Sequence, residues 1–338
     1  MAGENEKTIK DSLLLAWTII ARTLTDPIDM HLKNKTTIHE FWILGFENIH
    51  NILFLPFLLF LIIYFLTLSA NFTIISLVIA CRQINAPMYF FLSHLSFNDI
   101  LLSTTIEPEM LHIILREGSA ISRTGCFTQL YFFSVSATNE CFLLTVMSYD
   151  RYLAICNPLR YSSIMDLKLC IVLATSSWAC AMLFALPHIV LLQKMTFCGS
   201  YKINHFYCDL LPLLRLSCSE TSTIETVSAV NSLPILFLPL IFISVTYANI
   251  IVAILRISAS AGRRKAFSTC SSHLTVVCMY YGSIVFNYLV PSEGQYSGLQ
   301  KMVSVCYTIV TPLLNPLIYS LRNKEITRAL MKCTLKNT

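Results

Sequence analysis

Charged residues are scarce in this chain. Only 13% of the 338 residues are charged and 55% are hydrophobic, whereas about a quarter of the residues in a soluble globular domain are charged. This imbalance indicates a membrane protein rather than one or two soluble domains. The alternating patterns of strands are also missing, and a helix pairs every backbone amide within its own segment, as lipid demands. We therefore expect helical spans.

Catalytic and transport patterns are absent too. No His-Glu-x-x-His sequence or other paired catalytic motif occurs, which argues against an intramembrane enzyme. Internal repeats and helices broken at the midplane, which are typical of secondary transporters, are missing. No basic patch is interleaved with aromatic residues, so nucleic acid is not an expected partner.

Seven apolar stretches are long enough for the roughly 20 residues that a bilayer core requires. The sequence thus predicts an all-α fold, a seven-transmembrane helix bundle in the lipid bilayer, in which 1–51 form an N-terminal segment, 52–321 the bundle and 322–338 a tail. The expected spans are 52–80, 88–112, 126–151, 168–189, 225–255, 265–290 and 299–321.

The distribution of charge gives the orientation. The loops and tail on one side hold 13 Lys and Arg residues against three acidic ones, Asp150, Asp166 and Glu325. Basic residues concentrate on the cytoplasmic side of membrane proteins. We therefore predict an extracellular N-terminus and a cytoplasmic C-terminus.

The segment before the first span is harder to interpret. Asn34-Lys35-Thr36 is an N-glycosylation sequon on the predicted outer side. The apolar run Leu13–Ala21 follows Lys7 and Lys10 and suggests a signal peptide, but the acidic residues around it favour an uncleaved, partly disordered extension. Residues 1–33 thus have two interpretations.

Most of the 13 cysteines lie in predicted spans, where cysteine packs as a small apolar residue. Four of them, Cys126, Cys198, Cys208 and Cys218, lie on the oxidising side, and they allow three pairings between which their spacing does not choose. Cys333 in the tail is either a palmitoylation site or a free thiol.

Ionisable groups inside the membrane are costly and usually functional. Asp99 and Glu140 lie at about the same depth, roughly 16–18 Å from the inner end of their helices at 1.5 Å per residue. Asn71 and Asn315 lie near that level on two other helices. The four side chains form either a hydrated pocket for Na⁺ or a proton, or a structural network of interhelical hydrogen bonds. Apart from this Na⁺, no metal or cofactor is expected.

Asp150-Arg151, at the end of the third span, is the most informative pair of charges. The surrounding sequence Met147–Cys156 resembles the third-helix signature of the odorant receptors, a branch of the rhodopsin-like G-protein-coupled receptors. Three further blocks, 87–99, 265–273 and 312–323, resemble the same family in the expected order. The resemblance extends from about Asn34 to the C-terminus.

This resemblance implies a non-enzymatic odorant receptor, a multi-pass protein of the plasma membrane that is expected in the cilia of olfactory neurons. It implies a small volatile or water-soluble ligand and a heterotrimeric G protein of the stimulatory olfactory type, which raises cyclic AMP. The long second outer loop is similar to that of the tetrapod-type members, which implies the disulfides Cys126–Cys208 and Cys198–Cys218. The loop would then cover the bundle as a lid.

The sixth helix begins with Arg263-Arg264-Lys265, so no acidic residue is available there to hold Arg151. We expect Asp150 and neighbouring polar or aromatic groups to hold it instead. His273 is either a switch residue or a packed helix histidine. The candidate residues for G-protein coupling and switching are Asp150, Arg151, Tyr152, Tyr247, His273, Asn315, Pro316 and Tyr319.

A ligand pocket is expected in the outer half of the bundle, because several residues of the third helix share one face at i, i+3, i+4 and i+7 spacing. The face is apolar, with hydroxyls and without a carboxylate, so it favours a small, neutral, mostly apolar ligand. The candidates are Leu130, Phe133, Ser134, Ala137, Asn231, Ser232, Ile235, Tyr281, Ile284, Val285, Tyr288, Val305 and Thr308.

Overall fold

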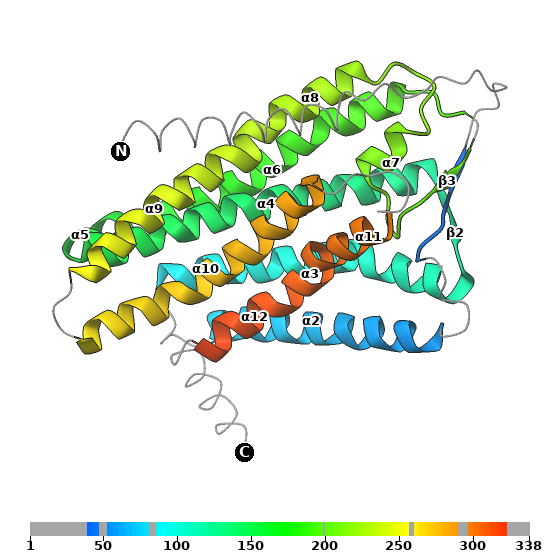
Figure 1. Cartoon of the computed structure of the whole chain (residues 1–338). Helices are drawn as coiled ribbons and strands as arrows, with labels where there is room; N and C mark the ends of the chain where they lie inside the picture. The colour runs from blue at the N-terminus through cyan, green and yellow to red at the C-terminus, as the bar shows by residue number, and fades with distance from the viewer. Residues whose placement is uncertain are drawn as a thin grey trace.

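The computed structural model describes residues 39–46, 53–80, 86–198, 200–256, 260–289 and 297–322. Seven long helical segments run side by side, with short strands gathered at one end of the bundle and the short helix α5 at the other (Figure 1). The segments are α2 Phe54–Ala80, α3 Pro87–Arg116, α4 Arg123–Cys156, α6 Leu167–Lys194, α8 Ser222–Ser232 with η1 Leu233–Phe237 and α9 Leu238–Leu255, α10 Ser260–Leu289, and α11 Ser297–Val305 with η3 Cys306–Val310 and α12 Thr311–Arg322.

All seven predicted spans coincide with these segments. Five of the segments are long and apolar enough to cross a membrane by length and composition. The other two are α3, which carries Asp99, Glu107 and Glu109, and α10, which begins with basic residues. The seven-helix bundle predicted from hydropathy is therefore the observed fold.

Local sequence signals set the ends of the helices. α3 begins with Pro87, whose missing N–H is harmless in the first turn. Ser122 caps α4 by accepting a hydrogen bond from Gly125 N, and Asp166 caps α6 by accepting one from Leu169 N. These polar caps fix where α4 and α6 enter the bundle.

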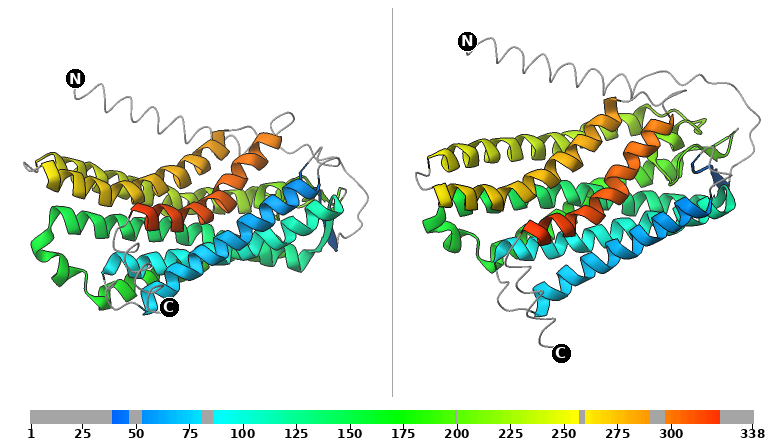
Figure 2. Two further views of the ribbon diagram at one scale, coloured as in Figure 1. Left: turned by 90° about the horizontal axis from the view of Figure 1, so that it is seen from below. Right: turned by 60° about the horizontal axis from the view of Figure 1, so that its bottom comes forward.

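α4 is the central helix. It packs against α3, α6 and α9, and the views in Figure 2 show it enclosed by its neighbours. More than half of the most apolar part of α4 is buried, whereas α2 exposes large side chains such as Phe54, Leu55 and Phe65. Exposed apolar side chains on the outside of a helix bundle match contact with lipid tails. The central helix α4 therefore carries several of the candidate site residues.

Two π-helical turns interrupt long segments. η1 lies between α8 and α9, and η3 lies between α11 and α12. A π-turn adds a residue to one helical turn and thus rotates the side chains on either side of it relative to each other. Both turns lie near the level of the predicted ligand pocket.

A small sheet covers the outer end of the bundle. It contains β1 (Glu40–Ile43), β2 (Ser119–Ser122) and β3 (Lys202–Ile203), with β1 in the middle, antiparallel to β2 and parallel to β3. The sequence did not predict these strands, because runs of two to four residues are too short to show alternation. The connecting loops also contain two short helices, α5 (Pro158–Ile164) and α7 (Leu210–Leu214).

Candidate functional site: an outer cavity and an inner polar cluster

The second outer loop, which joins α6 to α8, is held by two disulfides. Cys126 at the start of α4 is linked to Cys208, and Cys198 is linked to Cys218 within the loop. These are the pairings that the family resemblance implied. The loop residues Phe206, Tyr207 and Cys208 are fully buried, so the loop is a packed part of the protein interior.

Tyr207 connects this lid to two helices. Its ring lies 4.9 Å from that of Phe133 on α4, measured between centroids. Its hydroxyl forms a 2.9 Å hydrogen bond with the hydroxyl of Tyr307 in η3. The lid therefore contacts the third and seventh spans directly above the cavity.

The neighbouring His205 is buried against Lys301 of α11. Burial and the charge of this lysine lower the pKa of His205 to about 3, so the imidazole is neutral at physiological pH. Lys301 itself donates hydrogen bonds to Gly45 O and Asn204 Oδ1. Buried polar groups thus join the lid to the seventh span and to the chain that follows β1.

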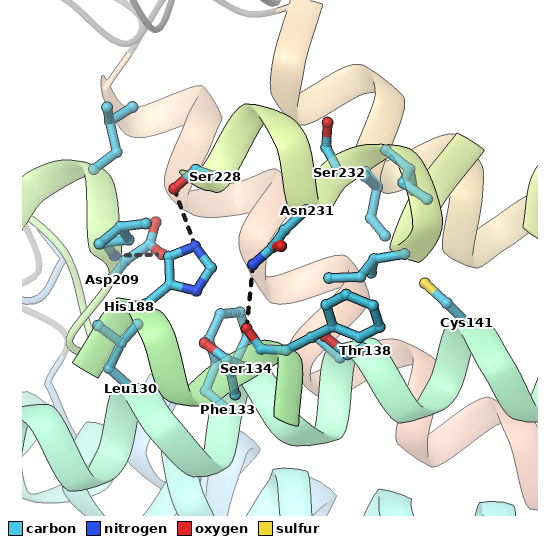
Figure 3. A pocket seen from close by; sticks show the side chains of 18 of the residues that line it. Leu130, Phe133, Ser134, Thr138, Cys141, His188, Asp209, Ser228, Asn231 and Ser232 are labelled. Atoms are coloured by element: carbon cyan, nitrogen blue, oxygen red, sulfur yellow. Dashed lines mark hydrogen bonds between the residues drawn. The ribbon is translucent and has the colours of Figure 1, made fainter. Parts of the chain in front are cut away.

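A cavity of about 320 Å³ lies beneath the lid, between α4, α6, α8 and α10 (Figure 3). Most of its surface is apolar, and its volume suits a small organic molecule. Among the predicted ligand residues, those that line it are Leu130, Phe133, Ser134, Ala137, Asn231, Ser232, Ile235 and Ile284.

Other candidates lie elsewhere. Tyr281 is buried away from the cavity, Val285 is 44% exposed on the outer face of α10, and Val305 and Thr308 do not line the cavity. The side chain of Tyr288 lies outside the described residues, as do Asn34 and Cys333. The π-turn η3 explains why the two predicted residues of the seventh span do not line the cavity. Tyr307, which lies between them in the sequence, lines the cavity instead.

Several residues that line the cavity were not predicted from the sequence. Thr138 and Cys141 continue the i+4 and i+7 series of the third helix and were within reach of that argument. The fold of the loop, which no local pattern encodes, places Asp209 and Leu210 at the rim. His188 on α6 was not predicted, because the expected pocket included no residue of the fourth span.

Polar groups collect at one wall of this cavity. His188 Nε2 lies 3.1 Å from Ser228 Oγ, and Asn231 Nδ2 donates to Phe184 O at 3.3 Å. Asp209 caps α7 by accepting a 2.8 Å hydrogen bond from Leu210 N. Burial in the lid raises the pKa of Asp209 to about 6, although this hydrogen bond favours the charged form.

A second cluster lies deeper in the bundle. Asn315 Nδ2 is 3.1 and 3.2 Å from the two carboxylate oxygens of Asp99 and 3.4 Å from Glu140 Oε1. All three side chains are buried, and Glu140 Oε2 has no hydrogen-bond partner. Asn71 does not join them, since its Nδ2 donates to Thr67 O and Pro312 O. The structure thus brings together three of the four predicted residues. No group of three His, Cys, Asp or Glu side chains able to hold a metal ion occurs in the described part of the chain.

At the inner end, Arg151 is held by its neighbour Asp150. Arg151 Nε donates to Asp150 Oδ2 at 2.9 Å, and Nη2 contacts the same oxygen. Tyr161 of α5 donates to the other carboxylate oxygen at 2.8 Å, a contact that the sequence did not predict. Burial and Asp150 raise the pKa of Tyr161, which keeps its hydroxyl protonated as the donor.

Tyr247 and His273 pair with each other. The Tyr247 hydroxyl lies 2.7 Å from His273 Nδ1, and His273 Nε2 lies 3.0 Å from Leu144 O. The histidine is fully buried and links α9, α10 and α4. The hydroxyl of Tyr319, by contrast, is buried without a hydrogen-bond partner.

A bundle of seven spans with an outer cavity under a disulfide-bonded lid and an Asp-Arg pair at the inner end of the third span defines a G-protein-coupled receptor. The sequence profile of the olfactory receptor family matches residues 60–337. The chain therefore belongs to the olfactory receptor family, whose members are receptors and not enzymes.

Individual relatives agree over nearly the whole chain. Olfactory receptor 5P55 of Mus musculus is 42% identical over 307 residues, which cover 91% of this chain and 99% of that protein. Olfactory receptors 11L1 and 5P3 of Homo sapiens are each 44% identical over 303 residues, which cover 90% of this chain and 94% and 97% of those proteins.

Proposed function

We propose that a small, neutral and mostly apolar odorant binds in the cavity beneath the lid and activates a heterotrimeric G protein of the stimulatory olfactory type, which raises cyclic AMP. The mostly apolar character of the cavity carries this proposal. Burial contributes about 25 cal/mol per Å² of apolar surface, whereas one hydrogen bond contributes about 0.5–1.5 kcal/mol net. Apolar burial therefore sets the affinity, and polar groups set the orientation. The working location is the plasma membrane of olfactory cilia.

Signalling requires a change at the inner end. Ligand shifts a two-state equilibrium in which the inner end of α10 moves outward and opens a groove beside Arg151. In this step the hydrogen bonds of His273 to α4 and α9 break and are replaced by others. Asn315, Pro316 and Tyr319 on α12 repack at the same time. Tyr152, next to Arg151, faces the same groove for the G protein.

Arg151→Ala tests this function. It should abolish the cyclic AMP response to odorants at matched surface expression, and it should leave ligand binding intact because Arg151 lies at the opposite end of α4 from the cavity. Arg160→Ala, at an exposed position of α5, is the control. A normal response from the Arg151 variant would rule out this role.

Asp99 and Glu140, together with Asn315, hold a Na⁺ ion in the resting state. An uncompensated pair of carboxylates at this depth is costly, and the free Oε2 of Glu140 offers an unused cation ligand. Asn71 is linked to the same helical segment as Asn315, because its Nδ2 donates to Pro312 O, three residues before Asn315. Replacing external Na⁺ by choline should raise agonist potency in the wild type but not in Asp99→Asn, and a wild-type receptor without sodium dependence would leave a purely structural network.

A further inference from the structure

The polar wall of the cavity differs from the rest of its surface. His188 on α6 and Ser228 and Asn231 on α8 lie close together there, opposite the apolar side chains of Leu130 and Phe133 on α4 (Figure 3). The protons and lone pairs that these three polar side chains keep free determine which functional group can bind beside them.

The hydroxyl proton of Ser228 is already used. Ser228 Oγ donates to Ile224 O at 2.8 Å, one turn earlier in α8. A serine hydroxyl has one proton and two acceptor lone pairs. Toward the cavity, Ser228 can therefore only accept.

Both tautomers of His188 lead to the same result. If the proton is on Nε2, it is donated to Ser228 Oγ, which keeps the second of its two lone pairs. If the proton is on Nδ1, on the side of the Phe184 backbone one turn earlier, Nε2 accepts the hydroxyl proton of Ser228 and both lone pairs of Ser228 remain free. In either case the His188–Ser228 pair offers an acceptor and no proton.

Asn231 supplies the complementary group. One of its two Nδ2 protons is donated to Phe184 O, so one N–H and the oxygen Oδ1 remain for a ligand. The wall thus presents an acceptor at His188–Ser228 next to a donor at Asn231. A hydroxyl donates and accepts at once and satisfies both, whereas ethers, aldehydes and ketones only accept.

We propose that His188, Ser228 and Asn231 select ligands that carry a hydroxyl group, namely alcohols and phenols. The hydroxyl donates to the His188–Ser228 pair and accepts from Asn231, and the hydrocarbon part of the ligand lies against Leu130 and Phe133. This inference rests on the proposed function and names the chemical class of its ligand.

Matched ligands test the selection. Cells that express the full chain with a cyclic AMP reporter are given 1-hexanol, 1-octanol, 2-phenylethanol and phenol. Each is compared with its methyl ether, and the three alcohols also with the corresponding aldehydes. The hydroxyl compound should be more potent than its ether and aldehyde by roughly two- to twelve-fold, the range that one net hydrogen bond gives. Equal or greater potency of the ethers or aldehydes would overturn the proposal, as would a response to other classes without any response to hydroxyl compounds.

Variants locate the selection at this wall. Ser228→Ala and Asn231→Leu should bring the potency ratio of alcohol to ether close to one. Two exposed residues of α9, away from the cavity, are the controls. Ser244 donates to Leu240 O one turn earlier at 2.7 Å, as Ser228 does to Ile224 O, and Asn249 also donates to a backbone carbonyl, that of Val245 in its own helix at 2.8 Å. Ser244→Ala and Asn249→Leu should keep the wild-type ratio.

The potency ratio is measured within each variant and is therefore independent of expression level. His188→Phe, which keeps a ring of similar shape without nitrogen atoms, provides a second route if Ser228→Ala does not reach the surface. A ratio that stays at the wild-type value in the pocket variants would refute the assignment. Failure of the proposed function would look different, since no odorant of any class would then give a response that Arg151→Ala removes.

Discussion

The outer and inner ends of the bundle are held together by different means. The outer end has two disulfides, a three-stranded sheet and the Tyr207–Tyr307 hydrogen bond. The inner end has a single ion pair in the described part of the chain, Asp150–Arg151, and the hydrogen bonds of His273. Covalent links at one end keep the cavity in shape, while a few exchangeable contacts at the other allow the helices to move.

Removal of a lid disulfide should have the largest effect. Cys126→Ser leaves Cys208 unpaired and removes a disulfide between residues 82 positions apart. In the chain-entropy model, such a disulfide stabilises the folded state by roughly 4–5 kcal/mol. We expect surface delivery to be lost, as measured by antibody labelling of a tagged N-terminus on intact cells. Cys218→Ser breaks the shorter link of 20 residues and should be less severe. Normal delivery of the Cys126 variant would show that the lid folds without this bond.

At the inner end, Asp150→Asn should raise basal signalling. The variant removes the negative charge that holds Arg151, and a charge-assisted hydrogen bond is worth about 1.5–3 kcal/mol, which corresponds to roughly a ten- to hundred-fold shift of the resting equilibrium. Basal cyclic AMP at matched surface expression is the measurement. Asp166→Asn, which changes only the cap of α6, is the control, and an equal rise in both would point to a nonspecific charge effect.

Within the cavity, Phe133→Ala should weaken every agonist. The ring of Phe133 lines the cavity and packs against Tyr207. Without the ring, a ligand loses apolar contact area that contributes about 2 kcal/mol or more to the binding free energy. Dose–response curves should shift by roughly ten-fold or more. The adjacent Phe132 is 41% exposed on the other side of α4, so Phe132→Ala should leave the curves in place. Similar shifts for both variants would contradict this placement of the ligand.

The smallest effect is expected between the two ends, at Gly282 in α10. A Cβ atom added there meets no heavy atom within 4 Å, so Gly282→Ala stiffens the helix by about 0.5–1 kcal/mol without a clash. If Gly282 is the hinge of α10, the maximal response should fall by roughly two- to five-fold. Gly298→Ala in α11 is equally free of contacts and is the control. An unchanged response in both variants would place the hinge elsewhere.

The same comparison shows what the sequence could predict. The spans follow from length and hydropathy, because each must cross about 30 Å of hydrocarbon. Asp99, Glu140 and Asn315 were predicted to meet because a straight helix converts sequence separation into depth. These rules act within single helices, and they hold best in the regular middle of the bundle.

Loops and helix irregularities limited the prediction of the cavity. Asp209 and Leu210 line the cavity because of how the long loop between α6 and α8 folds, which no local sequence pattern predicts. The four cysteines alone allowed three pairings, and only the family resemblance indicated which one forms. Tyr307 replaced Val305 and Thr308 because η3 rotates the seventh span, and the i+3 and i+4 rule assumes a regular α-helix.

The central position of β1 has a practical consequence for anyone who modifies this receptor. Glu40–Ile43 hydrogen-bond to β2 on one side and to β3 on the other, and Lys301 Nζ donates to the carbonyl of the following Gly45. A truncation that removes this strand would leave two neighbouring strands with unpaired backbone groups. Affinity tags, fluorescent fusions and shortened expression variants therefore need to keep the chain intact from His39 onward, even though this stretch precedes the first helix.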